Sequence, residues 1–431
     1  MKRIIIIGGG FAGLKLAEKL NNTAYDVLLI DKLNHHQFQP LFYQVATAGL
    51  EPSSISFPLR GIFHHSRNVR IRYAEVSAVI PDKNCILTSI GELTYDYLVI
   101  ATGVTTNFFG NKNLEKWAYP MKSTSEAINI RQHVLQNFED ALVASEEDRR
   151  RLMNVVIVGG GPTGVELSGA FAEMKRHVFP RDYPELDFKQ MNVILMEGSD
   201  KTLGNMSSQS SAKSKQYLEE LGVTVMLNTR VKDYDGQQVL LEDGNVVPSN
   251  TVIWAAGIRG NAIDGMPVDA ITHGNRFLVD RFSLVKECAN IYAIGDIAFM
   301  VTEKYPQSHP QVANVALGQA AVLAKNFRQA LQSKPWQPYE YKDKGSMATV
   351  GKHKAVVDLG FGHFQGFFAW FVWMGLHLLL LMGMKNKIFV FVDWLIAYFS
   401  NDSTLRLIFS PVNKKKHSQG ASQDASTSSA R

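Results

Sequence analysis

Two apolar runs, one at the start of the chain and one near its middle, show the same pattern of hydrophobic and polar positions. Residues 4–7 and 155–158 are entirely aliphatic, as in strands that are buried on both faces of a parallel sheet. Each run leads into a glycine-rich turn and then into a helical pattern. This order of strand, turn and helix predicts an α/β protein with two copies of a Rossmann-like unit.

Both glycine-rich turns have the spacing G-x-G-x-x-G. The first glycine makes the tight turn, the second lets the backbone approach a pyrophosphate, and the third lets the helix pack on the strand. The helix N-terminus adds N–H donors and the positive end of its dipole. Two such turns predict two bound dinucleotides. The glycines are Gly8, Gly10 and Gly13 in the first turn and Gly159, Gly161 and Gly164 in the second.

Each turn is followed by a second apolar run that ends in an acid, Asp31 in the first copy and Glu197 in the second. A carboxylate at the end of the next strand is the usual partner of a ribose diol. Glu197 would accept hydrogen bonds from a free 2'-hydroxyl and repel a 2'-phosphate. The second site is therefore expected to prefer NADH to NADPH.

Composition narrows the class of protein. A chain of 431 residues with 45% hydrophobic residues is long enough for two or three domains. The only cysteines, Cys85 and Cys288, are far apart, which argues against a disulfide framework, a C-x-x-C redox pair or a zinc site. Met1 leads almost directly into the first strand and leaves no room for a signal peptide, so the nucleotide domains are expected in the cytoplasm.

The net charge of +5 is concentrated at the C-terminal end. From Lys385 onward there are seven Lys or Arg residues and three acids, which supply four of the five excess charges. Because these basic residues accompany long apolar runs, they indicate an anionic membrane surface as the partner and argue against nucleic acid.

Several other segments, between the two glycine turns and after them, also allow structural predictions. Residues 32–47 are too apolar for an idle surface loop, and they form either a packed connection or a loop beside the cofactor's ring. Ser123 and Glu126 resemble a capping box that opens one charged connecting helix reaching about Arg151. The segment that ends in Asp296 presents an acid that could hold a cofactor hydroxyl or cap the next helix.

Residues 367–384 are apolar except for His377, and residues 388–399 are apolar except for Asp393. A spanning helix needs about 20 apolar residues, so the first run is borderline and the second too short. Their aromatic residues and flanking lysines suit an interface. A monotopic pair of interfacial helices, a spanning hairpin and a buried dimer interface are the three interpretations, and the first is preferred.

Together, the two glycine motifs, Asp31, the Ala-Thr-Gly segment at 101–103 and Gly295-Asp296 resemble the two-dinucleotide-binding flavoproteins of the glutathione-reductase kind. Three further segments narrow this resemblance to the type II NADH dehydrogenases, single-subunit NADH:quinone oxidoreductases that do not pump protons. These segments are residues 38–47, residues 161–166, and residues 366–373 followed by His377.

The resemblance implies the domains and the cofactor sites. Residues 1–115 and 270–345 would form the FAD-binding domain, 116–269 the NADH-binding domain with its connecting helix, 346–412 a membrane-anchoring region, and 413–431 a disordered tail. The FAD-binding residues would be Gly8, Gly10, Phe11, Ala12, Gly13, Asp31, Lys32, Val76, Ala101, Thr102, Gly103 and Asp296. The NADH-binding residues would be Gly159, Gly161, Gly164, Glu197, Ala256 and Gly257.

Glu166 lies two residues after Gly164, where any acid gains from the helix dipole. The resemblance gives it a catalytic role, facing the flavin and helping to position the nicotinamide or to protonate the quinone. Gln44, Asn314 and Gln319 are the expected quinone contacts. Many family members have A-Q-x-A-x-Q where this chain has Asn314 and Gly318 in place of the two glutamines; Asn314 can still donate to a carbonyl, with a shorter reach.

The expected activity is hydride transfer from NADH to FAD and two-electron transfer to ubiquinone or menaquinone. The expected protein is a homodimer that attaches monotopically to the cytoplasmic face of the membrane. Three alternatives are a sulfide:quinone oxidoreductase, a ferredoxin or rubredoxin reductase, and an NADH-sensing flavoprotein of the apoptosis-inducing-factor kind.

Overall fold

The computed structural model describes residues 1–400 and 405–409. The chain divides into two compact units. Unit 1 consists of residues 1–37, 56–105 and 258–344, and unit 2 consists of residues 38–55, 106–257 and the chain from residue 345 on. The disordered tail expected over residues 413–431 lies outside the described residues.

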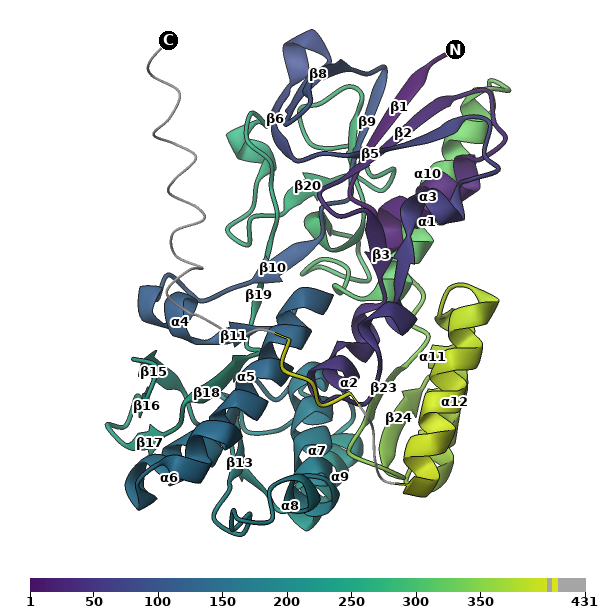
Figure 1. Cartoon of the computed structure of the whole chain (residues 1–431). Helices are drawn as coiled ribbons and strands as arrows, with labels where there is room; N and C mark the ends of the chain where they lie inside the picture. The colour runs from purple at the N-terminus through teal and green to yellow at the C-terminus, as the bar shows by residue number, and fades with distance from the viewer. Residues whose placement is uncertain (401–404, 410–431) are drawn as a thin grey trace. The chain divides into compact units, whose positions relative to one another are not determined.

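Unit 1 is built on a five-stranded parallel sheet with the order β21-β9-β1-β2-β5 (Figure 1). The first apolar run forms its central strand β1 (Arg3–Ile7), which pairs with β2 (Asp26–Asp31) and β9 (Tyr97–Ile100). Ile5 shares one hydrophobic core with Val79 and Ile86 of the hairpin that covers this face. Burial on both faces explains why the run is continuous instead of alternating.

Helix α1 (Phe11–Leu20) follows β1 and packs against α10 (Ala313–Ala330). The remaining strands of unit 1 are β3 (His35–Gln37), β4 (Ser56–Pro58), β5 (Val69–Tyr73), β6 (Val76–Ile80), β7 (Cys85–Thr88), β8 (Gly91–Thr94), β20 (Phe277–Val279), β21 (Ile291–Ala293) and β22 (Ala298–Met300). Its short helices are α3 (Leu59–Ile62), η3 (Pro81–Lys83), η4 (Val268–Ala270) and η5 (Gly295–Ile297). Strands β10 (Val104–Thr106) and β19 (Ile258–Gly260) lie where the chain passes from one unit to the other.

Unit 2 repeats this plan with a second parallel sheet, ordered β11-β18-β12-β13-β14 (Figure 1). Its centre is β12 (Val155–Val158), formed by the second apolar run and flanked by β13 (Val193–Met196) and β18 (Thr251–Trp254). The antiparallel strands β15, β16 and β17 share a core with one face of the sheet. The two Rossmann-like units predicted from the sequence are thereby confirmed.

The other elements of this part of unit 2 are α2 (Phe42–Ala46), α4 (Lys112–Trp117), α5 (Thr124–Val143), α6 (Glu146–Met153), α7 (Pro162–His177), α8 (Phe179–Asp182), α9 (Ser208–Glu220), η1 (Gln39–Leu41), η2 (Pro52–Ile55), β11 (Tyr119–Pro120), β14 (Val223–Met226), β15 (Val231–Tyr234), β16 (Gln238–Leu241) and β17 (Val246–Pro248). Helix α2 packs against α5 and α7. The apolar segment that continues from the first unit is therefore a packed part of unit 2 from residue 38 on.

The C-terminal part of unit 2 begins with the antiparallel strands β23 (Ser346–Thr349), β24 (Ala355–Leu359) and β25 (Gly362–Gln365). Helices α11 (Phe367–Leu380) and α12 (Met384–Ser400) follow and lie side by side (Figure 1). β23 packs on α7, and β24 packs on α9 and α11. This packing places the C-terminal helices beside the second nucleotide-binding unit.

The connecting helix differs from the expectation. Ser123 Oγ accepts the N–H of Glu126 at 3.2 Å and the Glu126 carboxylate accepts the N–H of Lys122 at 2.6 Å, so the helix start is confirmed. A single helix to Arg151 is wrong, because α5 ends at Val143 and α6 begins at Glu146. Ser145 breaks the helix by accepting the N–H of Asp148 as a new N-cap.

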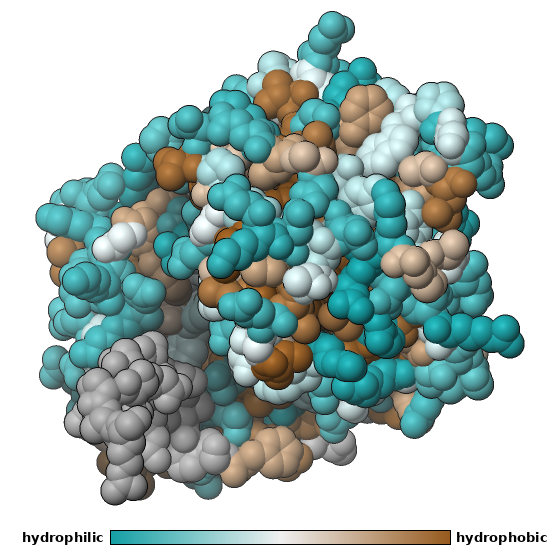
Figure 2. All heavy atoms as spheres, turned by 90° about the horizontal axis from the view of Figure 1, so that it is seen from above, coloured by the Kyte–Doolittle hydropathy of each residue, from teal (hydrophilic) through white to brown (hydrophobic). Residues whose placement is uncertain are grey.

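One face of the molecule is mostly polar. Figure 2 shows this face, on which hydrophilic residues predominate and hydrophobic residues lie in small separate groups. In the described chain, most of the large hydrophobic side chains that are exposed lie on α11, α12 and residues 405–409. None of the helices in the described part of the chain is both long enough and apolar enough to cross a membrane.

Candidate functional site

The first glycine turn forms a cradle between β1 and α1. Gly8 has φ +105°, and a Cβ atom there would lie 2.4 Å from the carbonyl oxygen of Ala101. A Cβ on Gly13 would lie 1.9 Å from the carbonyl oxygen of Gly8. A Cβ on Gly10, in contrast, would meet nothing within 4 Å. The outer two glycines are thus required by the protein's own packing, and the middle one leaves space for a ligand's phosphates.

Asp31 closes this cradle at the end of β2. Its carboxylate accepts the N–H of Gly9 at 2.5 Å and the N–H of Leu33 at 2.6 Å. Burial raises the pKa of this carboxyl, while the two N–H groups partly oppose that effect. The two bonds hold the carboxylate at the glycine turn, where a ribose diol is expected.

A cavity of about 420 Å³ in unit 1 brings together residues that are far apart in the sequence. It is lined by Asp31, Lys32, Val76 and Thr102, all expected to bind the first cofactor. Sequence reasoning missed Asn261, whose carbonyl accepts the Thr102 hydroxyl at 2.8 Å and whose amide donates to the Thr102 carbonyl at 3.0 Å. The only signal in the sequence is that residues 258–264 follow the Ala-Ala-Gly segment at 255–257, just after β18.

The second glycine turn repeats the first. A Cβ on Gly159 would lie 2.7 Å from the carbonyl oxygen of Ala255, and one on Gly164 would lie 1.9 Å from that of Gly159. A Cβ on Gly161 would again meet nothing within 4 Å. Glu197 accepts the N–H of Gly160 at 2.5 Å. Both cradles therefore have the same open position and the same carboxylate.

The expected nicotinamide end of the second site lies at Ala256 and Gly257. Gly257 has φ +92°, and a Cβ there would lie 2.6 Å from Cζ of Phe109. The backbone N–H of Asn107 donates to the Gly257 carbonyl at 3.2 Å. Phe109 is itself exposed and has φ +52°. No local pattern in the sequence predicts an aromatic ring over this glycine.

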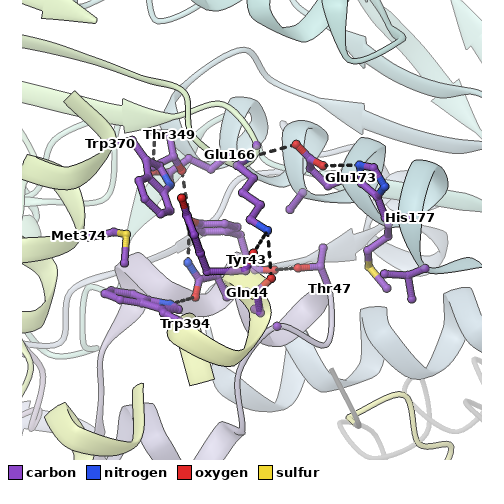
Figure 3. Close-up of a pocket in the computed structure, with 18 of the residues that line it drawn as sticks. Tyr43, Gln44, Thr47, Glu166, Glu173, His177, Thr349, Trp370, Met374 and Trp394 are labelled. Atoms are coloured by element: carbon purple, nitrogen blue, oxygen red, sulfur yellow. Dashed lines mark hydrogen bonds and ion pairs between the residues drawn. The ribbon is translucent and has the colours of Figure 1, made fainter. Parts of the chain in front are cut away.

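A second cavity, of about 210 Å³, lies wholly within unit 2 (Figure 3). Helix α7 contributes Glu166, Ala170, Glu173 and His177, which recur at helical spacing and share one face. The opposite wall is aromatic and apolar. Its members include Trp370, Trp373 and Met374 of α11 and Trp394 of α12.

Glu166 is the most deeply buried carboxyl group in this cavity. Only 8% of its surface is exposed, and burial raises its pKa to about 8. The backbone N–H of Thr349 donates to Oε1 at 3.3 Å and opposes the shift. The indole of Trp373 acts in the same direction, although its Nε1 makes no hydrogen bond of good geometry within the described residues. At neutral pH Glu166 is therefore mainly a protonated acid.

A chain of hydrogen bonds connects the C-terminal helices to this acid (Figure 3). Trp394 Nε1 donates to Gln44 Oε1 at 2.7 Å, and Gln44 Nε2 donates to the Tyr43 hydroxyl at 2.9 Å. The Tyr43 hydroxyl lies 3.1 Å from Oγ1 of Thr349. The pKa of Tyr43 is raised by burial and by Glu166, so the phenol stays neutral. Gln44, an expected quinone contact, is thus held in the wall of the cavity.

The other expected quinone contacts lie on α10 in unit 1. Asn314 is half-buried in the first turn of the helix. Gln319 is 1% exposed, and its Oε1 accepts the backbone N–H of Gly295 at 2.7 Å. At Gly318, a Cβ atom would lie 2.6 Å from the hydroxyl of Tyr339. The ring of Tyr339 therefore occupies the space that a glutamine side chain would need at position 318.

Two parallel sheets, each with an open glycine turn and a carboxylate at the next strand end, define a two-dinucleotide-binding oxidoreductase. The sequence profile described as pyridine nucleotide-disulphide oxidoreductase matches residues 2–320, and that of the NDH2 C-terminal domain matches residues 344–401. The chain is 32% identical over 418 residues to the type II NADH:quinone oxidoreductase Ndh of Mycobacterium tuberculosis, with 92% of this chain and 88% of the relative covered.

Two solved structures share the fold. NDH2 from Plasmodium falciparum in complex with NADH matches with a TM-score of 0.88 at 22% identity, covering 95% of this chain and all of the other. The sulfide:quinone oxidoreductase of Aquifex aeolicus matches with a TM-score of 0.70 at 19% identity, covering 93% and 95%. The chain belongs to the pyridine nucleotide-disulphide oxidoreductase family and, within it, to the type II NADH:quinone oxidoreductases.

Proposed function

We propose that this chain oxidises NADH in unit 2, uses FAD held in unit 1, and passes two electrons to a quinone that enters the cavity around Glu166. The observation that carries the quinone site is the combination of a buried, protonated acid with an aromatic wall from the C-terminal helices. When bound, FAD supplies the two-electron chemistry that links the hydride donor to the quinone.

The residues of both cradles fit these dinucleotides. The open positions at Gly10 and Gly161 accommodate phosphates, and Asp31 and Glu197 offer acceptors for ribose hydroxyls. Because the carboxylate of Glu197 repels an additional phosphate, it selects NADH over NADPH.

Reduction of a quinone to a quinol consumes two protons as well as two electrons. Glu166 holds a proton at neutral pH next to a cavity in which an aromatic ring can stack on Trp370 or Trp394. Glu166 is therefore the proposed donor of the first proton. Gln44 fixes the orientation of Trp394 through its 2.7 Å hydrogen bond and so shapes the wall that receives the quinone.

The C-terminal helices are the proposed membrane attachment. Phe368, Phe371, Phe391 and Phe399 are all about half exposed or more, which is costly unless the helices lie against an apolar medium. Helix α11 has 14 residues and is about 21 Å long, well short of an apolar bilayer core of about 30 Å. Lysines at 385 and 387 suit the anionic headgroup region. A monotopic, interfacial position is the arrangement that fits these features.

The cytoplasmic side of the membrane and a homodimer remain parts of the proposal. Protease accessibility in right-side-out and inside-out vesicles tests the first. Light scattering of the detergent-solubilised protein tests the second. Exposure to protease only on the outside, or a monomeric mass at all concentrations, would contradict them.

Anaerobic stopped-flow on the FAD-loaded protein tests the central proposal. NADH should bleach the flavin absorbance, and ubiquinone or menaquinone analogues should restore it. Bleaching without recovery would mean that another electron acceptor is used. Cys85 and Cys288 line neither cavity, so sulfide chemistry has no thiol at either site in the described chain.

Ala170→Leu gives a sharper test of the quinone cavity. The larger side chain keeps the helix and fills part of the 210 Å³ space. The recovery of flavin absorbance on adding quinone should slow at least about tenfold, because the quinone ring and the leucine side chain compete for the same space. The rate of flavin bleaching by NADH should stay within about twofold of the wild-type rate. Slower bleaching together with unchanged recovery would place the quinone elsewhere.

A further inference from the structure

The turn at Gly295 and Asp296 is held by side chains from three separate parts of unit 1. Arg276 Nε donates to the carbonyl of Asp296 at 2.9 Å, and Gln311 Nε2 donates to the same oxygen at 3.1 Å. Gln319 Oε1 accepts the N–H of Gly295 at 2.7 Å. The peptide group before Gly295 and the one after Asp296 are thus fixed by hydrogen bonds, which restrict the backbone of the turn that carries the Asp296 side chain.

Gly295 needs this support because of its backbone conformation. Its φ is +78°, and a Cβ there would lie 3.0 Å from the Cβ of Ala12, at the start of α1. Its N–H points into the core, where no water replaces a lost acceptor. An unpaired buried N–H costs roughly 1–3 kcal/mol, so the turn depends on the oxygen of Gln319.

The other end of the Gln319 amide is enclosed by protein. The side chain is 1% exposed, and Nε2 is buried without a hydrogen-bond partner among the described residues. Gln319 does not line the 420 Å³ cavity of unit 1, so its oxygen is the part of the amide that acts on the turn.

We propose that Gln319 is a positioning residue for FAD and not a quinone contact. Its oxygen holds the Gly295 N–H and thereby presets Asp296 toward the cofactor's ribityl hydroxyls. This proposal rests on FAD occupying unit 1. The same part of α10 departs from the family's quinone motif at position 318. Because Tyr339 fills the space beside Gly318, a glutamine side chain does not fit there, and we assign this part of the helix to support of the turn at Gly295.

Three variants separate the possible roles. Gln319→Leu removes the acceptor and the donor, whereas Gln319→Glu keeps an oxygen that can accept the Gly295 N–H. Asn326→Leu is the matched control: Asn326 is a fully buried amide on the same helix that bonds the backbone of Gln337 at 2.8 and 2.9 Å, away from the turn. FAD affinity of each apoprotein is measured by quenching of flavin fluorescence, without NADH or quinone.

Gln319→Leu should weaken FAD binding at least about tenfold and shift the absorption spectrum of bound flavin. Gln319→Glu should bind FAD within about threefold of the wild type. Asn326→Leu should lower the melting temperature but leave FAD affinity within about twofold. If Gln319→Leu does not fold, Gln319→Asn, which is too short to reach Gly295, takes its place.

Unchanged FAD affinity in Gln319→Leu, with a raised KM for quinone, would overturn the proposal and restore the quinone contact. A Gln319→Glu variant as weak as Gln319→Leu would also overturn it, because the acceptor would then not matter. Since FAD binding is measured without turnover, failure of quinone transfer would leave this readout intact.

Discussion

Among single residues, the proposed chemistry rests on carboxyl groups whose surroundings differ. Glu166 is buried against tryptophans, and desolvation raises its pKa to about 8. Glu197 lies at a strand end, where two backbone N–H groups bind its oxygens at 2.5 and 2.7 Å. The first is suited to give up a proton and the second to accept hydrogen bonds, because a proton donor must be protonated at the working pH.

Glu166→Gln should lower kcat for quinone reduction by about 100-fold, in the range of general acid catalysis. In the wild type, activity should fall as pH rises through about 8, because the carboxyl then loses its proton. The variant has no such group, and its profile should be flat in this range. Steady-state rates between pH 6 and 9.5 measure both effects.

Glu219→Gln on α9, where Glu219 forms an exposed ion pair with Lys215, is the matched control and should keep the wild-type pH profile.

The stability of the protein gives an independent check of the Glu166 assignment. Because the folded-state pKa is raised from 4.5 to about 8, the native state binds more protons than the unfolded state between these values. The free energy of unfolding should therefore fall as pH rises through this window, and less so in Glu166→Gln. Equal slopes in both proteins would contradict the assigned burial.

Glu197→Gln should relax the discrimination against NADPH by about tenfold or more in kcat/KM, since the repulsion of a 2'-phosphate is removed. The Cγ of Arg230 lies 3.3 Å from where a Cβ on Gly198 would be, directly after Glu197. Its guanidinium is available to attract the additional phosphate. Adding Arg230→Gln to Glu197→Gln should therefore reverse part of the gain in kcat/KM for NADPH. Selectivity that is unchanged in the single variant would remove Glu197 from this role.

Among the elements of unit 2, helix α7 has a different role from helices α11 and α12. Helix α7 carries the second glycine turn at its N-terminus and lines the cavity with Glu166, Glu173 and His177 along one face. Helices α11 and α12 bury only a few side chains each, among them Trp373 and Trp394. Many of their other apolar side chains are exposed, which separates a face toward the cavity from the face that is proposed to attach to the membrane.

Replacing Phe368, Phe371 and Phe391 together by Ser should weaken binding to anionic vesicles at least about tenfold. Burial of each ring in an apolar medium contributes about 1.5–3 kcal/mol, so three losses give a measurable change even if insertion is partial. Sedimentation with phosphatidylglycerol-containing vesicles measures it. Val143→Ser and Val268→Ser, at exposed apolar positions on other elements, are the controls. Equal binding of all variants would refute the attachment through α11 and α12.

In the molecule as a whole, two similar units are proposed to hold two different dinucleotides. The open positions make the sites separable: a Cβ atom added at Gly10 or Gly161 meets no described protein atom within 4 Å, yet a side chain there would enter the space proposed for the phosphates. Gly10→Val should therefore fold but fail to retain FAD. Gly161→Val should retain FAD but raise the KM for NADH by about 100-fold or more.

Flavin absorbance of the purified variants and NADH titration measure the two outcomes, and thermal melting shows that both variants fold. FAD added to the apoprotein at 100 times its Kd should stabilise it by about 2.7 kcal/mol, and Gly10→Val should show no such gain. Loss of FAD from Gly161→Val would mean that the two sites are not independent.

Much of the fold was predictable because its signals are local. The apolar runs, the glycine spacing and the capping box at Ser123 depend on neighbours a few residues away. The break at Ser145 was missed because charged residues continue the helical pattern across it, and only the N-cap bond to Asp148 reveals a new start. Phe109 over Gly257 and Asn261 beside Thr102 were missed because distant segments form them.

The two glycine cradles and the acids that complete them follow from local sequence alone. A glycine turn and the strand end beside it are close in the chain, and few other residues satisfy their steric limits. Long-range packing, in contrast, brings residues 38–55 into the second unit, buries Glu166 behind tryptophans from the C-terminal helices, and turns the oxygen of Gln319 toward Gly295. Burial and hydrogen-bond partners of these groups come from residues up to 350 positions away, as between Gln44 and Trp394, and periodicity carries no information about such contacts.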